Sequence, residues 1–185
     1  LQSGRILAFI PKQHLPNYAE FNEVRYFARG EEEVIPLLFE GEEIPFGAGL
    51  LLCAQAESGG SVPPAVVGCE ICEDVWVAEA PNIALAASGA NIMVNLSASN
   101  EVIGKETYRR ELITNTSARL IVGYLYATAG EGESTQDAVF SGHNMIADNG
   151  HLLAESRLFQ NGIIYGEIDV NSLNLSRRRN TTCVT

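Results

Sequence analysis

The sequence predicts an α/β fold in which helices pack on a central sheet. Between residues 65 and 127, short apolar runs alternate with segments of helical composition. The expected elements are a strand at 65–71, a helix at 81–89, a strand at 91–97, a helix at 104–120 and a strand at 121–127. This alternating order is typical of a sheet covered by helices.

The first 60 residues predict shorter strands joined by loops. Residues 5–10 form an apolar run that Pro11 ends, because proline cannot donate a hydrogen bond to a strand ladder. A brief strand is expected at 34–39 within a loop rich in Glu and Gly, and an apolar strand at 49–54. The small residues at 58–61 predict a hairpin-like turn before the next strand.

The two expected helices carry different signals. Pro81 suits the first turn of a helix, and Gly89 suits the end of one. In the longer helix, side chains that recur every four residues predict the buried face. These side chains are Tyr108, Leu112, Thr116 and Leu120. The basic residues Lys105, Arg109 and Arg110 are expected on other faces.

The C-terminal third predicts a hairpin, a last strand and a tail. Asn149-Gly150 supplies the positive φ angles of a tight turn between apolar runs. Residues 163–170 alternate like a strand. Residues 177–185 begin with three arginines and show no packing pattern, so we expect a solvated tail or linker there, with a partner-docking patch as the alternative.

Composition places the chain among single-domain globular proteins. It has 185 residues, 46% of them hydrophobic and 19% charged. The net charge of −11 argues against a broad basic surface for nucleic acid or anionic lipid. No apolar run approaches the length of a membrane span, and no secretory signal opens the sequence. Four cysteines over this length indicate no disulfide scaffold, so we expect a reducing, cytoplasmic compartment. The sequence begins without Met, and we expect it to be a piece of something longer.

Cys69 and Cys72 can be interpreted in four ways. A structural zinc site needs four soft ligands, and the sequence holds no second cysteine pair. A redox pair needs both sulfurs on one exposed turn, whereas Cys69 falls within the expected strand and Cys72 at its end. Both could be inert core residues, since cysteine is often buried. As a nucleophile, Cys72 would need a carboxylate base and a cation such as Lys12, at the end of another expected strand. Glu73 is too close in sequence to be an obvious base, and so is its neighbour Asp74.

Five separated segments contain recognisable motifs. They are Pro11-Lys12-Gln13-His14-Leu15-Pro16-Asn17-Tyr18 with Glu20-Phe21 and Glu23, Glu70-Ile71-Cys72-Glu73-Asp74-Val75-Trp76, Asn95-Leu96-Ser97-Ala98-Ser99-Asn100, Gly104-Lys105 with Tyr108-Arg109-Arg110, and Gly130-Glu131-Gly132-Glu133-Ser134-Thr135. In this order they resemble the glutaminase domains of glutamine-dependent NAD synthetases, within the nitrilase superfamily. The resemblance runs from about residue 4 to about residue 179.

This resemblance implies a cysteine hydrolase that acts on carbon–nitrogen bonds. Cys72 would be the nucleophile that forms a γ-glutamyl thioester with glutamine. Lys12 would polarise the carbonyl group and stabilise the oxyanion. The backbone N–H of Glu73 would complete the oxyanion hole.

The resemblance also implies supporting residues around the substrate. Tyr18 and Ser99 match positions that line the glutamine pocket, and Trp76 would pack against that pocket. Glu23 matches a second carboxylate that supports the site. Each has a simpler interpretation: Tyr18 could be a packing tyrosine, Ser99 a turn or N-cap residue, and Glu23 a solvated side chain.

The implied fold is a four-layer αββα sandwich, with its first strand–helix unit apparently missing. We expect a partial glutaminase domain at 4–176 and a tail or linker at 177–185 toward a synthetase domain that is absent from the sequence. The glutamate of the family's Cys-Lys-Glu triad lies before the lysine motif, so it has no expected counterpart here, and this stretch alone could be inactive. A deleted first strand would leave an unpaired sheet edge.

The expected function is glutamine hydrolysis that supplies ammonia for the amidation of deamido-NAD. No cofactor or metal is expected in this chain, whereas ATP and Mg²⁺ would bind the synthetase domain. Expected partners are glutamine, that domain and further copies of the chain, with no nucleic acid and no membrane. The alternatives are a nitrilase-like amidase for small amides and a non-catalytic assembly module.

Overall fold

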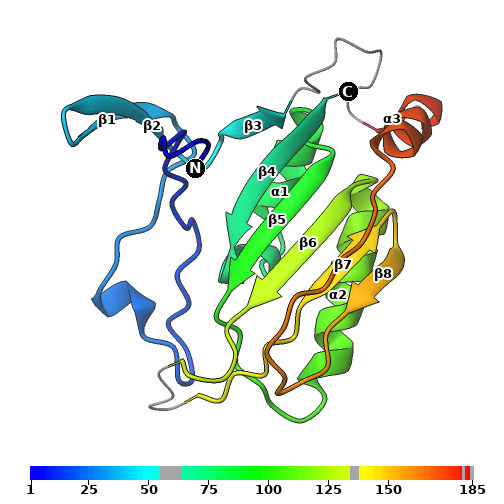
Figure 1. Cartoon of the computed structure of the whole chain (residues 1–185). Helices are drawn as coiled ribbons and strands as arrows, with labels where there is room; N and C mark the ends of the chain where they lie inside the picture. The colour runs from blue at the N-terminus through cyan, green and yellow to red at the C-terminus, as the bar shows by residue number, and fades with distance from the viewer. Residues whose placement is uncertain (55–63, 134–137, 181, 184–185) are drawn as a thin grey trace.

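The computed structural model describes residues 1–54, 64–133, 138–180 and 182–183. A six-stranded sheet with the strand order β3-β4-β5-β6-β7-β8 forms its centre (Figure 1). The strands are β3 (Leu51–Ala54), β4 (Ala65–Ile71), β5 (Ile92–Ser97), β6 (Gly123–Thr128), β7 (Met145–Asp148) and β8 (His151–Glu155). A separate two-stranded sheet joins β1 (Ile35–Phe39) to β2 (Glu42–Phe46). The expected turn at 58–61 lies outside the described residues.

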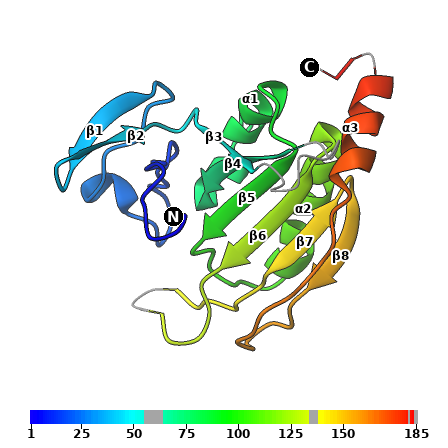
Figure 2. The same ribbon diagram turned by 45° about the horizontal axis from the view of Figure 1, so that its top comes forward.

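The centre of the sheet is parallel, as the alternating order of the elements predicts. β4 pairs with β5 and β5 with β6 in parallel, while β3, β7 and β8 add antiparallel edges. The parallel strands are joined by α1 (Pro81–Ala87) and α2 (Lys105–Leu120), and both helices cover the same face of the sheet (Figure 2). The carboxyl ends of the parallel strands therefore meet at one edge, where open α/β sheets place their ligand sites.

The main hydrophobic core lies between this face and the two helices. Its fully buried members include Met93 on β5 and Ile113 on α2. The buried residues of α2 are Arg109, Ile113, Thr116 and Ser117. Of the predicted face, Thr116 is buried and Leu112 and Leu120 pack against the core, whereas Tyr108 is exposed and Arg109 is buried instead.

Two predicted strands are absent as regular elements. In the run at 5–10, Phe9 forms only an isolated bridge to Phe46. Residues 161–169 carry no strand assignment and lie extended over the sheet face opposite the helices. A Cβ atom on Gly123 would come within 2.7 Å of the Ile168 side chain, so this segment packs directly on β6. Apolar alternation here reflects packing on a sheet face rather than pairing within a ladder.

The expected tail begins inside a packed helix. α3 spans Val170–Arg179, and Asp169 caps it by accepting a hydrogen bond from the Ser172 backbone. Arg177 is buried and donates hydrogen bonds to three backbone carbonyls, those of Ala90, Leu120 and Ile121. The boundary predicted between residues 176 and 177 therefore cuts through an ordered element. None of the helices in the described part of the chain is long and apolar enough to cross a membrane.

The hairpin prediction is confirmed. β7 and β8 pair in antiparallel register around Asn149 and Gly150, with φ angles of 45° and 86°. Both values lie in the left-handed region that a two-residue hairpin turn requires.

Candidate active site

Cys72 occupies the sharp turn that follows strand β4. It is the first residue of a 3₁₀ turn, η2 (Cys72–Val75), and is 8% exposed. Its φ angle is 49°, a left-handed value that is uncommon for a residue with a side chain. Backbone strain of this kind persists only where surrounding contacts hold it, and it is frequent at active sites.

Asn95 supplies part of that support. It lies on β5 with no exposed surface. Its Oδ1 accepts a hydrogen bond of 3.0 Å from the Cys72 backbone N–H, and its Nδ2 donates one of 3.4 Å to the Cys72 carbonyl. The amide thus holds both backbone groups of the strained residue.

Asp74 joins the cysteine turn to the segment that carries Lys12. Its carboxylate is buried and accepts hydrogen bonds from the backbone N–H groups of Gln13 at 3.2 Å and His14 at 2.8 Å. It also bonds to the His14 Nδ1 at 3.0 Å and accepts from the Ile71 N–H at 2.9 Å. Because these bonds hold the backbone of both segments, Asp74 acts as a clamp between two motifs that lie 60 residues apart.

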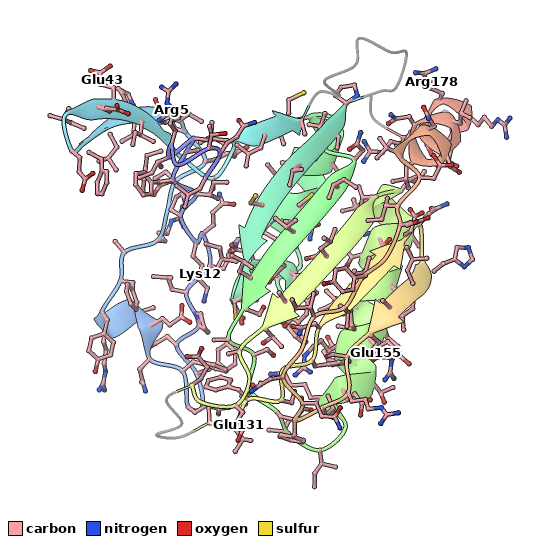
Figure 3. The ribbon with its side chains drawn as sticks, in the orientation of Figure 1. Arg5, Lys12, Glu43, Glu131, Glu155 and Arg178 are labelled. Carbon is pink, nitrogen blue, oxygen red and sulfur yellow. The ribbon has the colours of Figure 1, made fainter. Side chains whose placement is uncertain are left out.

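Lys12 lies beside the carboxyl ends of β4 and β5 (Figure 3). Its Nζ contacts the Glu23 Oε2 at 2.5 Å. Both side chains line a cavity of about 660 Å³ that Cys72 and Ser97 also line. The structure therefore brings Cys72, Lys12 and Glu23 to one cavity and ion-pairs the lysine with the carboxylate. The last motif also reaches this cavity through Glu133, although its Ser134 and Thr135 fall in the part of the chain left undescribed.

Cys72 also lines a second cavity, of about 430 Å³. It is lined by the four remaining predicted site residues, Tyr18, Glu73, Trp76 and Ser99. The Tyr18 hydroxyl donates to both carboxylate oxygens of Glu73, at 2.9 and 3.0 Å. Partial burial and then the Glu73 carboxylate raise the pKa of Tyr18 to about 12, so the phenol remains a donor at neutral pH. All seven predicted residues thus line one or both of two cavities that share Cys72.

Cys69 has a different environment from Cys72. It lies within β4, it is half-buried, and burial raises the pKa of its thiol. In the described ranges, one group of side chains is close enough to share a metal ion, namely Glu106, His143 and Glu155. That group contains no cysteine, so the geometry gives the zinc interpretation of Cys69 and Cys72 no further ligands.

A buried arginine stands behind the second cavity. Arg109 has no exposed surface and donates to the Ser99 Oγ at 3.4 Å and the Asn100 carbonyl at 3.1 Å. Its other amino group contacts the Glu101 Oε2 at 3.0 Å and the His143 Nδ1 at 2.8 Å. These bonds fix the strand end that presents Ser99 to the cavity.

Asn95, Lys105 and Arg109 belong to the motifs of the sequence, but the sequence alone predicted no role for them. Asn95 carried a usable signal, because an amide inside an apolar strand must find partners when it is buried. Arg109 carried none, since arginines on amphipathic helices are usually solvated.

Taken together, a mixed sheet with helices on one face and a strained cysteine at its carboxyl edge define a protein of the α/β class with a nitrilase-like fold. The sequence profile of the carbon–nitrogen hydrolase family matches residues 3–178. The chain belongs to the carbon–nitrogen hydrolase family.

Curated relatives of this chain include glutamine-dependent NAD⁺ synthetases. The chain is 40% identical over 172 residues to the glutamine-dependent NAD⁺ synthetase of Mycobacterium tuberculosis, covering 93% of this chain and 25% of that protein. The human glutamine-dependent NAD⁺ synthetase is 28% identical over 166 residues, covering 84% of this chain and 22% of that protein. The chain therefore spans about a quarter of the length of these curated relatives.

Solved structures of a glutamine-dependent NAD⁺ synthetase and of a carbon–nitrogen hydrolase superpose on this chain. The glutamine-dependent NAD⁺ synthetase of Cytophaga hutchinsonii superposes with a TM-score of 0.64 at 26% identity, covering 80% of this chain and 22% of that one. A carbon–nitrogen hydrolase of Helicobacter pylori superposes with a TM-score of 0.65 at 19% identity, covering 91% and 54%. The second comparison supports the fold alone.

Proposed function

We propose that this chain contributes the nucleophile, Cys72, to the hydrolysis of the side-chain amide of glutamine. The Cys72 sulfur attacks the amide carbon, and its proton passes to a base. The tetrahedral intermediate expels ammonia, which carries that proton away, and leaves a γ-glutamyl thioester. Water then hydrolyses the thioester to glutamate and restores the thiol. The observation that carries the proposal is the strained Cys72 at the junction of two cavities, one of them shared with Lys12.

Lys12 and the turn after Cys72 would stabilise the developing oxyanion. A preorganised cation and backbone donor in a site of low dielectric constant stabilise such charge strongly. Glu23 is paired with Lys12 at 2.5 Å, which favours a role in holding the ammonium over a role as the proton acceptor. The acceptor in the proposed reaction is the triad glutamate of the superfamily, for which the motifs of this chain offer no counterpart.

The ammonia would serve NAD⁺ synthesis, as the names of the relatives suggest. We propose that it amidates deamido-NAD in an ATP- and Mg²⁺-dependent synthetase domain, within a cytoplasmic homo-oligomer. No cofactor, nucleic acid or membrane enters the proposed glutaminase step.

Two cysteine variants of the protein test the nucleophile. Cys72→Ala should reduce ammonia release from glutamine to background and abolish the glutamyl adduct in intact-mass spectra. Cys69→Ala is the matched control, because Cys69 lies three residues earlier within β4. Activity that survives Cys72→Ala, or is lost equally in both variants, would refute the assignment.

A substrate comparison separates the proposed function from its rivals. Faster hydrolysis of simple aliphatic amides than of glutamine would identify a small-amide amidase. A Cys72 thiol no more reactive toward alkylation than a free cysteine, together with no hydrolysis of either substrate, would identify an assembly module.

A further inference from the structure

Asn95 is buried behind the nucleophile and lines neither of the two cavities that share Cys72. Its side chain binds only to groups of the protein. The Oδ1 atom accepts from the Cys72 N–H at 3.0 Å and from the Ser97 hydroxyl at 2.8 Å, and the Nδ2 atom donates to the Cys72 carbonyl at 3.4 Å. Any effect of Asn95 on the reaction must therefore act through the residues that it contacts.

The partners of the Asn95 amide allow it only one orientation. A backbone N–H can only donate and a backbone carbonyl can only accept. Exchanging the amide oxygen and nitrogen would set two donors against each other at the Cys72 N–H and two acceptors at the Cys72 carbonyl. The Ser97 hydroxyl adds a second donor on the Oδ1 side. The amide therefore grips the backbone of Cys72 on both sides of its Cα atom.

The bond to the Cys72 carbonyl also sets the direction of the next backbone N–H. The Cys72 carbonyl and the Glu73 N–H belong to one trans peptide group, in which the two bonds point in opposite directions. A carbonyl held on the buried side by Asn95 therefore turns the Glu73 N–H away from the core. Glu73 is the second residue of η2, so its N–H has no partner within that turn.

The left-handed conformation of Cys72 makes this grip necessary. A φ angle of 49° is unfavourable for a residue with a Cβ atom and persists only where contacts hold it. Because β4 is fixed in the sheet, rotation about this bond would move the thiol and the following peptide group together. Asn95 opposes that rotation, since it binds the backbone both before and after the Cα atom.

We propose that Asn95 is a positioning residue that aims the Glu73 N–H at the oxyanion by holding the peptide group between Cys72 and Glu73. The inference rests on the proposed function for the nucleophile and for the oxyanion donor. Negative charge develops on the substrate oxygen only as the sulfur bonds to the carbonyl carbon. A misdirected donor therefore weakens binding of the transition state and not of the substrate, so variants of Asn95 should lower kcat for glutamine with little change in KM.

Two reactions of the same thiol separate the oxyanion donor from the thiol itself. p-Nitrophenyl acetate acylates Cys72 through an oxyanion: the carbon–sulfur bond forms, the ester carbon–oxygen bond breaks and p-nitrophenolate leaves. Iodoacetamide alkylates Cys72 by displacing iodide from a saturated carbon, and no oxyanion develops. Both reactions consume the thiolate, so a change in the thiolate fraction cancels in the ratio of the acylation rate to the alkylation rate. The protein with Cys72→Ala gives the background for each rate.

Two variants of Asn95 should lower this ratio. Asn95→Asp keeps the shape and the acceptor for the Cys72 N–H but removes the donor to the Cys72 carbonyl. We expect the ratio to fall about 10- to 100-fold, because displacing a catalytic group by about 1 Å can cost about 100-fold in rate. Asn95→Ser shortens the side chain without adding a charge and should lower the ratio in the same way.

Asn91 provides a matched control at the other end of β4. It is buried, its Oδ1 accepts from the Val66 N–H at 2.9 Å, and its Nδ2 donates to the Pro64 carbonyl at 3.1 Å. Asn91→Asp therefore removes the same kind of backbone bond away from the nucleophile, and the ratio should keep its wild-type value. An unchanged ratio in both Asn95 variants, or an equal fall in Asn91→Asp, would overturn the role of Asn95.

The two reagents also separate this inference from the proposed function. If the wild-type protein releases no ammonia from glutamine, the proposed function fails, and the ratio of the two rates still decides the role of Asn95. If it releases ammonia while both Asn95 variants keep the wild-type ratio and the wild-type kcat, only the role of Asn95 fails. Acylation and alkylation that slow in proportion would confine Asn95 to placing the thiol and overturn its action through Glu73.

Discussion

Replacing Asp74 with asparagine should loosen the joint between the lysine and cysteine motifs. The Oδ1 atom of Asp74 bonds to two backbone N–H groups and the His14 ring, and Oδ2 accepts from the Ile71 N–H. An asparagine can place its oxygen at the Oδ1 position. Its NH₂ group then opposes the Ile71 N–H, so two donors face each other in a site that is 1% exposed.

The expected loss of stability can be estimated from these hydrogen bonds. A hydrogen bond to a charged group contributes about 1.5–3 kcal/mol, and a neutral one about half as much. Asp74→Asn removes one such bond and the charge assistance of the others, so the free energy of unfolding should fall by about 2–4 kcal/mol. Because His14 lies two residues after Lys12, the shift should also move the ammonium away from Cys72 and lower kcat.

Urea denaturation and glutaminase assays of the protein would measure both effects. The exposed Glu79 is a suitable control, since Glu79→Gln makes the same chemical change five residues away without disturbing a buried bond. A variant with wild-type stability and wild-type kcat would refute the view that Asp74 clamps the two motifs. A loss of stability with kcat intact would confine its role to folding.

Two further changes probe buried charges elsewhere. Burial raises the pKa of Glu70 above its ordinary value of 4.5. The neutral carboxyl therefore contributes stability that is complete below pH 4.5 and is lost as the pH rises through the pKa of the folded state. Glu70→Gln should therefore flatten the decline of melting temperature as the pH rises above about 4.5, and parallel curves for variant and wild type would contradict this. Arg177→Gln should lower the free energy of unfolding by about 3 kcal/mol, because three backbone carbonyls lose their buried donor. The exposed neighbour Arg178 is the control, since Arg178→Gln should change the free energy of unfolding by less than about 0.5 kcal/mol. Similar losses of stability in the two variants would contradict the role of Arg177 as a buried donor.

The central sheet could be predicted from local signals. Strands β4, β5 and β6 are apolar runs bounded by Gly, Pro and polar residues, and each joining helix has a start or stop signal within its sequence. Placing Cys72 after β4 and Ser99 after β5 then follows from parallel pairing, because both strands end at the same edge of the sheet. Cys72 and Lys12 were candidates from their places at strand ends, whereas the other five site residues came from the resemblance of their motifs. The structure gathers all seven around two cavities that share Cys72.

Other features depend on long-range contacts that local patterns do not encode. The run at 163–170 alternates like a strand, yet it packs on the sheet through Ile168 instead of pairing, and its last residue begins α3. The arginines near the C-terminus look solvated in sequence, but Arg177 finds three carbonyls that belong to other elements. A single sequence shows which residues are basic, not which of them meets unsatisfied acceptors in the fold.

The phase of α2 illustrates the same limit at the site itself. An apolar repeat places Tyr108 inward, whereas the fold buries Arg109 and leaves Tyr108 against the Trp76 ring at 5.5 Å. The arginine can be buried because the Ser99 hydroxyl, the Glu101 carboxylate and the His143 ring converge on its guanidinium. A buried charge is tolerated when it has such partners. Leu112, Thr116 and Leu120 of the predicted face do pack toward the core. Hydrophobic periodicity, which ignores polar partners, misses only the first turn, where Arg109 rather than Tyr108 is buried.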